Sequence, residues 1–320
     1  MTFSVIIPTL NRCDMLADAL ASVCAQSFPA DEYEIIVVDN GSLDETKNLV
    51  EQLNCDASKP IRYVWEERPG SHWARNAGAK AACGDILAYI DDDCVVDRDW
   101  LANLYGAYRE LNADGAGGKI LIRWDRDPGS WVLSYEAFLG MIDHGPEVRL
   151  LKPGQSINFG NFSIRRSRLF KIGGFNPDQI GDYLIGDGET GLCDKIHRAG
   201  WKIVWVPDAL VWHCQTVDRN ATLRDLRRRL ANDGREKAYA NCRRYPNGVY
   251  HILHWAVAAL LRFIAHKIVA LIRLTMQKKD AYRGHEVWAA YYKAEMLYYV
   301  RFLCDPWLRQ VVQRDDWING

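Results

Sequence analysis

Three adjacent carboxylates, Asp91, Asp92 and Asp93, follow the apolar run at residues 86–90. Such a run predicts a buried strand, so the three acids stand where that strand ends. Crowded carboxylates raise each other's pKa values and destabilise the fold unless a cation or bulk water compensates them. Carboxylate oxygens suit a hard divalent cation such as Mg²⁺ or Mn²⁺, which also binds substrate phosphates. The triplet therefore predicts a site for a metal-bound nucleotide, and a solvated acidic turn is the alternative.

A fourth acid, Asp39, ends another apolar run, at residues 35–38. Asn40, Gly41 and Ser42 follow it and are typical of a tight turn that leads into a helix. A plain turn explains Gly41 and Ser42, but it does not require an acid at the last position of the strand. Asp39 is therefore a candidate ligand-binding residue.

Two basic side chains are further candidates. Arg75 lies in the alanine-rich, helix-like run at residues 74–82, and its planar guanidinium can neutralise a diphosphate. His213 ends a later strand-like run and can bind a metal or a phosphate. A solvated surface arginine and a structural histidine are the alternatives.

A glycine-flanked loop at residues 186–191 carries Asp187 and Glu189 just before a predicted helix. An acid exposed on such a loop can act as a general base and take a proton from an incoming hydroxyl. Acids are also favourable at any helix N-terminus, so simple capping is the alternative.

The elements between residues 1 and 120 must bring these side chains together. Strand-like runs alternate there with helix-like segments, which predicts an α/β fold with a mostly parallel sheet covered by helices on both faces. Ligands of such sheets bind at the carboxyl ends of the strands. Thr9 and Asn11, Asp39 and the acidic triplet all follow strand ends, so we expect them at one edge of the sheet.

The composition divides the chain near residue 215. Residues 1–215 have globular character, with a first part at about 1–115 and a Gly-rich second part at 116–215. Residues 216–320 read as helical, rich in aromatic residues and basic, with 19 Lys plus Arg against 10 Asp plus Glu. A basic region suggests an anionic membrane surface, an acidic ligand or nucleic acid as its partner.

The nine cysteines are scattered without a CxxC pair. This spacing argues against a disulfide framework or a structural zinc site and favours a reducing, cytosolic setting. The N-terminus begins at once with a strand-like run, so no signal peptide is predicted.

The apolar segment at residues 249–274 is long enough to span a membrane. Arg262 lies at its centre, where a charged side chain is unfavourable in a bilayer. Polar residues lie along one side at spacings of three, four, seven or eight positions: His251, His254, Arg262, His266 and Arg273. We expect a helix in the membrane surface with this basic stripe toward the head groups, and docking onto the protein is the alternative.

Over residues 3–215 the chain resembles a family 2 glycosyltransferase of the GT-A fold. The resemblance rests on ordered motifs: SVIIPTLNR, VVDNGSLDET, ARNAGA, LAYIDDD, GNFSIRRSRLFKIGGFN and GDGETGLCDKIHRAGWKIVWVPDALVWH. It implies a Rossmann-like, mixed and mostly parallel sheet, here with a C-terminal helical extension. It also implies an inverting transferase that moves a sugar from a nucleotide diphosphate sugar to an acceptor hydroxyl with Mg²⁺ or Mn²⁺.

The resemblance assigns the nucleotide-sugar site by position. The residues implied at the base and ribose are Pro8, Thr9, Asn11, Asp39 and Asn40. Arg75 would approach the diphosphate. Asp91 and Asp93 match the family's D-x-D motif, with Asp93 as the direct metal ligand, Asp91 near the ribose and the metal, and Asp92 at the variable position beside the nucleotide sugar.

Three further positions complete the implied site. His213 is a candidate third metal ligand, and Gly160 and Asn161 match the segment that shapes the pocket for the donor sugar and the acceptor.

The catalytic base departs from the family pattern. In members of the family a Glu-Asp pair precedes a helix, whereas the aligned pair here is Gly188 and Glu189, preceded by Asp187. Leu192 fixes the alignment, so Glu189 is the first candidate for the base and Asp187 the second. Lys195 stands where an arginine is common.

Together these features predict a glycosyltransferase that acts on a lipid-linked or polysaccharide acceptor and binds no nucleic acid. We expect it in the cytoplasm, peripheral on the inner face of the cell membrane. A nucleotidyltransferase of related fold and a non-catalytic carbohydrate-binding or scaffold protein are the alternatives.

Overall fold

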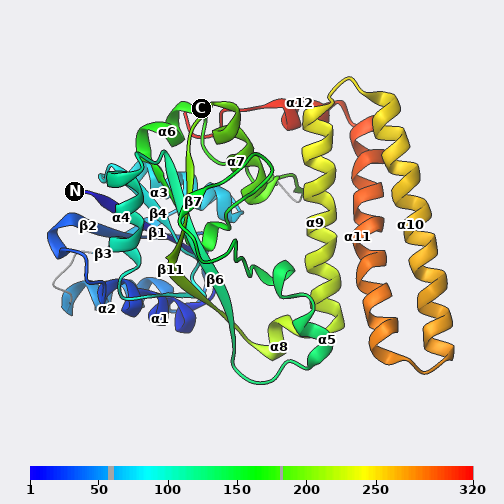
Figure 1. The fold of residues 1–320 in the computed structure, drawn as a ribbon, viewed down its shortest axis with the longest axis horizontal. Coiled ribbons are helices and arrows are strands. Elements are labelled where there is room, and N and C mark those ends of the chain that lie inside the picture. The colour runs from blue at the N-terminus through cyan, green and yellow to red at the C-terminus, as the bar shows by residue number, and fades with distance from the viewer. Residues whose placement is uncertain (57–60, 181–182, 320) are drawn as a thin grey trace.

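The computed structural model describes residues 1–56, 61–180 and 183–319. A twisted sheet with helices on both faces forms one part of the molecule, and three long helices stand beside it (Figure 1). The strands of the main sheet are β1 (Phe3–Thr9), β2 (Tyr33–Asp39), β3 (Ile61–Trp65), β4 (Ile86–Tyr89), β5 (Cys94–Val96), β6 (Gly115–Trp124), β7 (Arg149–Leu150), β8 (Phe162–Arg165) and β11 (Ile203–Gln215). A separate pair consists of β9 (Gln179–Ile180) and β10 (Tyr183–Leu184).

The strand order is β3-β2-β1-β4-β8-β6-β11-β5, with β7 paired to β11. The first four strands are parallel neighbours, and β11 runs parallel to β6. Strand β8 runs antiparallel between β4 and β6, and β5 is antiparallel to β11. The sheet is therefore mixed, as predicted, and the predicted α/β fold with flanking helices is confirmed.

Helices cover the two faces of this sheet. They are α1 (Cys13–Cys24), α2 (Thr46–Asp56), α3 (Ser71–Ala81), α4 (Trp100–Glu110), α6 (Arg166–Lys171) and α7 (Gly188–Arg198). Because successive side chains of a strand point to opposite faces, Val5 and Ile7 of β1 enter the core beneath α1 and α4. Ile6 enters the other core, beneath α3 and α7. Both faces are closed, so ligands have access at the edge where the strands end.

The C-terminal part is helical. Its elements are α8 (Val217–Asn220), α9 (Leu223–Arg244), α10 (Val249–Thr275), α11 (Lys279–Cys304) and α12 (Pro306–Gln313), and a short α5 (Ser130–Leu133) lies near the lower end of α9 (Figure 1). Helix α11 packs between α9 and α10. The chain end then returns to the sheet, where the amide of Trp317 donates to the carbonyl oxygen of Gly173 at 2.8 Å and Ile318 joins the core under α3. The helical part is thus fastened to the sheet at both of its ends.

Candidate active site

The carboxyl ends of β1, β2 and β4 meet at one edge of the sheet. Thr9 of β1 pairs with Asp39 of β2, and β4 pairs with β1 on the other side and leads directly into the acidic triplet. A cavity of about 440 Å³ opens at this edge. Eight of the predicted residues line it: Pro8, Thr9, Asn40, Arg75, Asp91, Asp92, Asp93 and His213. The structure therefore brings most of the predicted site into a single space.

Arg12 compensates two carboxylates of the triplet. Its guanidinium Nη1 lies 2.9 Å from Asp92 Oδ1 and 2.7 Å from Asp93 Oδ2, and the hydroxyl of Thr9 donates to Asp92 Oδ2 at 2.9 Å. Burial raises the pKa of Asp92 above its ordinary value, and the charge of Asp93 adds to this effect while Arg12 opposes it. Sequence analysis missed Arg12, although it directly follows Asn11 at the end of the first predicted strand.

Arg75 compensates the third carboxylate. Its Nη2 donates to Asp91 Oδ1 at 2.5 Å, and its Nη1 donates to the hydroxyl of Ser71, one turn earlier in α3, at 2.9 Å. The Arg75 side chain is only 6% exposed, so α3 holds it firmly. This position faces the cavity and suits the predicted contact with a diphosphate.

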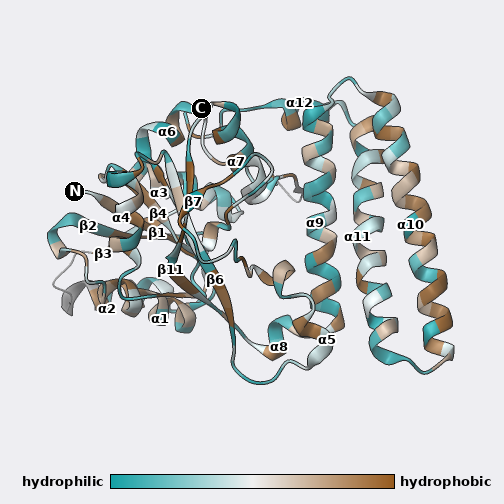
Figure 2. Cartoon of the chain, viewed as in Figure 1, coloured by the Kyte–Doolittle hydropathy of each residue, from teal (hydrophilic) through white to brown (hydrophobic). Residues whose placement is uncertain are grey.

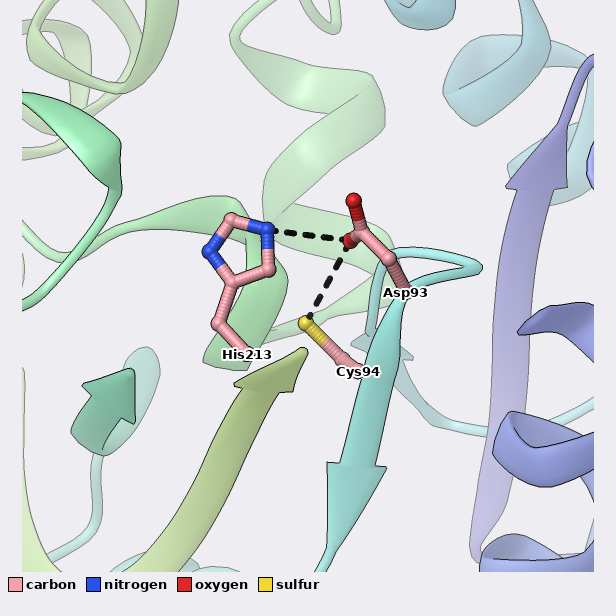
Figure 3. A group of neighbouring side chains, drawn as sticks. All are labelled: Asp93, Cys94 and His213. Carbon is pink, nitrogen blue, oxygen red and sulfur yellow. Dashed lines mark hydrogen bonds and ion pairs between the residues drawn. The ribbon is translucent and has the colours of Figure 1, made fainter. Parts of the chain in front are cut away.

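His213 holds the remaining oxygen of Asp93. His213 and Cys94 are opposite each other in the antiparallel β5–β11 pair, which places His213 Nε2 3.0 Å from Asp93 Oδ1 (Figure 3). Burial alone would raise the pKa of Asp93, but the charge and hydrogen bond of His213, together with Arg12, hold it below its ordinary value. For His213, burial lowers the pKa, but the attraction of Asp93 has the larger effect, so the pKa of His213 is raised.

Asp93, Cys94 and His213 offer three ligand atoms close enough to hold one metal ion (Figure 3). Burial raises the pKa of the Cys94 thiol well above its ordinary value, and the nearby carboxylates add to this shift. A protonated thiol is a poor ligand, so the oxygen atoms of Asp91 and Asp93 and the imidazole of His213 are the better donors. Oxygen and imidazole donors fit Mg²⁺ or Mn²⁺.

Asp39 lies beneath the cavity and supports its wall. Its Oδ1 accepts from the amides of Gly41 and Ser42 at 3.2 and 2.7 Å, and its Oδ2 accepts from the hydroxyl of Tyr63 at 2.8 Å. Asp39 is 1% exposed, and the described residues that line the cavity do not include it. Its neighbour Asn40 does line the cavity. For the predicted contact with Asp39, the nucleotide base would therefore have to reach past Asn40.

Asn11 joins two of the loops at this edge. It adopts a left-handed backbone conformation with φ of 54°, which asparagine tolerates better than most residues. Its backbone amide donates to the hydroxyl of Ser42 at 2.9 Å, and its Oδ1 accepts from the amide of Leu43 at 2.7 Å. The structure thus shows Asn11 fixing the β1 loop against the β2 loop.

The structure gives the two predicted residues Gly160 and Asn161 different surroundings. A methyl group on Gly160 would lie 3.2 Å from Asp91 Oδ2, so this glycine lets the backbone approach the triplet. Asn161 is fully buried, and its amide donates to the carbonyl oxygens of Lys119 and Ala209 while its Oδ1 accepts from the Trp100 indole. Asn161 therefore has a structural position, which corrects the prediction that it shapes the sugar pocket directly.

The two candidate bases also differ. Glu189 lies in the first turn of α7, and its side chain is outside the part of the chain that the structure describes. Asp187 is 4% exposed, and its Oδ1 accepts from Asn176 Nδ2 at 3.0 Å. A methyl group on Gly191 would lie within 2.0 Å of the Asp187 carboxylate, so this acid is folded against its own helix.

A buried polar network surrounds Asp187. Burial raises its pKa, while Asn176 and the charge of Lys195 oppose the shift. Lys195 Nζ donates to Asn176 Oδ1 at 2.8 Å and to the carbonyl oxygen of Gly174 at 3.0 Å. These contacts favour a structural role for both Asp187 and Lys195, which leaves Glu189 as the stronger candidate for the base.

Two further residues at the cavity were missed. Asp178 accepts from the amides of Ser71 and His72 at the start of α3, and no local sequence signal reveals a partner about a hundred residues away. Arg229 of α9 lines the cavity, and its Nη1 is buried without a hydrogen-bond partner among the described residues. It belongs to the basic run at residues 227–229, whose composition does not show which member points inward.

The sequence profile of "Glycosyl transferase family 2" matches residues 4–173. Glycosyltransferase AglE of Haloferax volcanii is 27% identical over 210 residues, which cover 66% of this chain and 66% of AglE. The glucosyl-dolichyl phosphate glucuronosyltransferase of the same organism is 25% identical over 67% of this chain and 69% of its own length. The chain thus spans about two thirds of each of these relatives.

Two solved structures share the fold. The mannosyltransferase PcManGT of Pyrobaculum calidifontis, in complex with GDP-Man and Mn²⁺, has a TM-score of 0.58 and 19% identity and covers 95% of this chain and 87% of its own. Residues 1–349 of TarS of Staphylococcus aureus give a TM-score of 0.53 and 17% identity, and cover 93% of this chain and 91% of that one.

Proposed function

The chain belongs to glycosyltransferase family 2, and on that premise we propose that it moves a sugar from a nucleotide diphosphate sugar to an acceptor hydroxyl, with a divalent cation and inversion at the anomeric carbon. One observation carries this proposal. A single cavity at the carboxyl edge of the sheet is lined by the acidic triplet, Arg75 and His213. The same space offers cationic groups for a diphosphate and oxygen ligands for a cation.

Asp91, Asp93 and His213 would hold the cation, because their donor atoms suit Mg²⁺ or Mn²⁺ and all three line the same cavity. When bound, the cation offsets the negative charge that builds on the leaving phosphate. The choice between Mg²⁺ and Mn²⁺ belongs to this proposal and rests on the donor atoms alone.

The chain's own residues would perform the other steps. Arg75 would bind the diphosphate with its planar fork of donors, and Arg229 would add a second guanidinium from α9. Asn40 and Pro8 would border the nucleotide base, and Thr9 would hold Asp92 in place. Glu189 would accept the proton of the acceptor hydroxyl as that oxygen attacks the face opposite the leaving group. A single displacement of this kind inverts the configuration.

A panel of nucleotide diphosphates tests the proposal directly. With Mn²⁺ present, we expect one of UDP, GDP or dTDP to raise the midpoint of thermal unfolding by about 5 °C at a hundredfold excess over its Kd. The corresponding nucleotide sugars should then be hydrolysed slowly in the absence of an acceptor. If none of the nucleotide diphosphates stabilises the protein at millimolar concentration with Mn²⁺, the proposal is contradicted.

The position of α10 bears on the acceptor. This helix is long and apolar enough to cross a membrane by length and composition, and only 17% of its most apolar window is buried in the molecule. Figure 2 shows hydrophobic residues along much of α10 at the outer side of the three helices. The exposed apolar side chains include Val257, Leu261, Ile264, Ile268 and Leu271.

Part of the basic side of α10 contacts α11. Lys267 Nζ binds Glu286 of α11 at 2.5 Å, Arg262 lies 5.6 Å from the ring of Tyr292, and His266 contacts His285. His251, His254 and Arg262 of the stripe are nevertheless exposed, so contact of the stripe with lipid head groups stays a prediction. The apolar side chains of α10 are exposed as well.

We place this apolar face in the interfacial region of a membrane, beside a lipid-linked acceptor. An apolar helix face of this length gains free energy by burial below the head groups. Lys278 and Lys279, at the turn between α10 and α11, are suited to anionic lipids there. The name of the glucuronosyltransferase relative, which specifies a dolichyl phosphate substrate, supports a lipid-linked acceptor.

Liposome sedimentation tests this placement. We expect the full chain to sediment with phosphatidylcholine vesicles that contain phosphatidylglycerol, and to stay bound in 0.5 M salt because apolar burial is not screened. Leu261→Glu combined with Leu271→Glu should weaken binding about 10²-fold or more, since each buried leucine contributes about 1.5–3 kcal/mol. Leu43→Glu is the matched control, because Leu43 is 94% exposed on the sheet part.

Two outcomes would contradict the membrane placement. One is a wild-type protein that ignores the vesicles. The other is a soluble dimer, seen by light scattering, that the double variant converts to a monomer, because the face would then bind a second copy of the chain.

A further inference from the structure

Both oxygens of Asp93 already have hydrogen-bonding partners. Oδ2 lies 2.7 Å from Arg12 and Oδ1 lies 3.0 Å from His213. Arg12 also reaches Asp92 at 2.9 Å. The guanidinium therefore stands among the carboxylates that would bind the cation of the proposed reaction.

Arg12 keeps its charge in this position. An arginine guanidinium is not deprotonated in proteins, and here it lies within hydrogen-bond distance of Asp92 and Asp93. A permanent positive charge beside Asp93 repels a divalent cation and competes for the same oxygen. Cation binding therefore requires Arg12 to leave.

Arg12 has room to leave. Its side chain is 41% exposed, and it lies between the 440 Å³ cavity and a neighbouring cavity of about 390 Å³. Asp218 and Asp225 line the second cavity beside Arg219 and Arg228, so a displaced guanidinium finds two further carboxylates there. A diphosphate in the first cavity would offer it an alternative anionic partner.

We propose that Arg12 is a built-in counter-ion that occupies the carboxylates in the empty enzyme and couples binding of the cation to binding of the nucleotide. This inference rests on the proposed function, because it needs a cation at Asp93 and a diphosphate beside it. A cation that arrives alone must displace Arg12 without compensation. A cation that arrives with a diphosphate brings the anion that Arg12 then binds. The two ligands thus favour each other's binding, as linkage requires.

Titration of the full chain with Mn²⁺ alone, followed by the electron paramagnetic resonance signal of free Mn²⁺, tests the proposal. We expect Arg12→Gln to bind Mn²⁺ about tenfold more tightly than the wild type, within the usual range of coupling between sites. Loss of a merely structural contact would weaken binding, so tighter binding identifies competition. Arg12→Lys keeps the charge and guards against misfolding of the Gln variant, and its affinity should lie between the other two.

Arg228→Gln is the matched control. Arg228 lines the neighbouring cavity and pairs with Asp225, and its side chain is 72% exposed. The substitution removes the same charge nearby without touching the triplet, so Mn²⁺ affinity should stay within about twofold of the wild type. An equal gain in both Gln variants would overturn the proposal, because a general field effect would then explain it.

A second arm measures the coupling itself. UDP and GDP should each be tested for the factor by which Mn²⁺ tightens their binding, and for the nucleotide that binds this factor should shrink in Arg12→Gln. If the wild type binds Mn²⁺ and Arg12→Gln binds it no more tightly, the inference fails while the proposed function stands. If no variant binds Mn²⁺ even with either nucleotide, the proposed function fails and this inference fails with it.

Discussion

Asp93→Asn lowers glycosyl transfer by about 10³-fold or more while the protein stays folded; this is the largest effect we expect. Replacing the carboxylate removes the proposed central ligand of the cation, whose stabilisation of the leaving phosphate is worth several kcal/mol. Asparagine keeps the volume, its Oδ1 can accept from Arg12, and its Nδ2 can donate to Nε2 of a neutral His213, so both partners keep a hydrogen bond in a buried site. Initial rates with a donor from the nucleotide panel measure the loss of transfer, and a thermal unfolding curve shows whether the protein stays folded.

Removal of the cation should have the same effect without a mutation. Transfer by the wild type should vanish in excess chelator and return when Mg²⁺ or Mn²⁺ is added. Asp99→Asn is the matched control for the substitution, because Asp99 is an exposed acid six residues further along the chain and accepts from the hydroxyl of Ser27. Full activity in excess chelator would contradict the metal assignment even if Asp93→Asn were inactive.

The edge of the sheet that carries the site could be predicted from sequence. Apolar runs that end in polar residues mark the ends of β1, β2 and β4, and parallel neighbours bring such ends together. Thr9 and Asp39 therefore meet in register, and the acidic triplet lies beside them. This inference needs only local patterns and one topological rule, which is why it was confirmed.

The partners of the triplet could not be predicted in the same way. His213 reaches Asp93 only because the short strand β5 pairs antiparallel with β11, and a three-residue strand leaves no periodic signal. Asp178 reaches α3 from the loop before β9. Such contacts depend on tertiary packing between distant segments, and spacing along the chain contains no information about them.

The sequence pattern also does not determine which face of a helix is exposed. Periodicity divides α10 into an apolar side and a polar stripe, but it does not show which side chains a neighbouring helix contacts. Glu286 and Tyr292 of α11 attract Lys267 and Arg262, although both basic side chains stay exposed. An amphipathic pattern thus predicts that a helix has two faces, and only the tertiary packing shows which groups of each face have partners.

The second large effect concerns the catalytic base, where Asp187→Asn and Glu189→Gln should have opposite signatures. Asp187 is buried, and its carboxylate accepts from Asn176 next to Lys195. Asparagine can still accept from Asn176 through its Oδ1, but it removes the negative charge near Lys195 and buries an amide donor that has no acceptor in the part of the chain that the structure describes, so the free energy of unfolding should fall by about 1–3 kcal/mol. The transfer rate of the folded fraction should change little, because Asp187 is not among the described residues that line the cavity.

Glu189→Gln should leave stability nearly unchanged and lower kcat by about 10²- to 10⁴-fold, the usual contribution of a general base. Because the amide cannot accept the proton of the acceptor hydroxyl, the loss should fall on the chemical step and not on the Kd of the nucleotide, which thermal shift measures separately. Slow hydrolysis of the donor by water offers a further comparison, since it should fall as well if the same base serves both reactions. The reverse pattern, with Asp187→Asn inactive but stable and Glu189→Gln active, would mean that the helix presents the preceding acid to the acceptor and that the two roles must be exchanged.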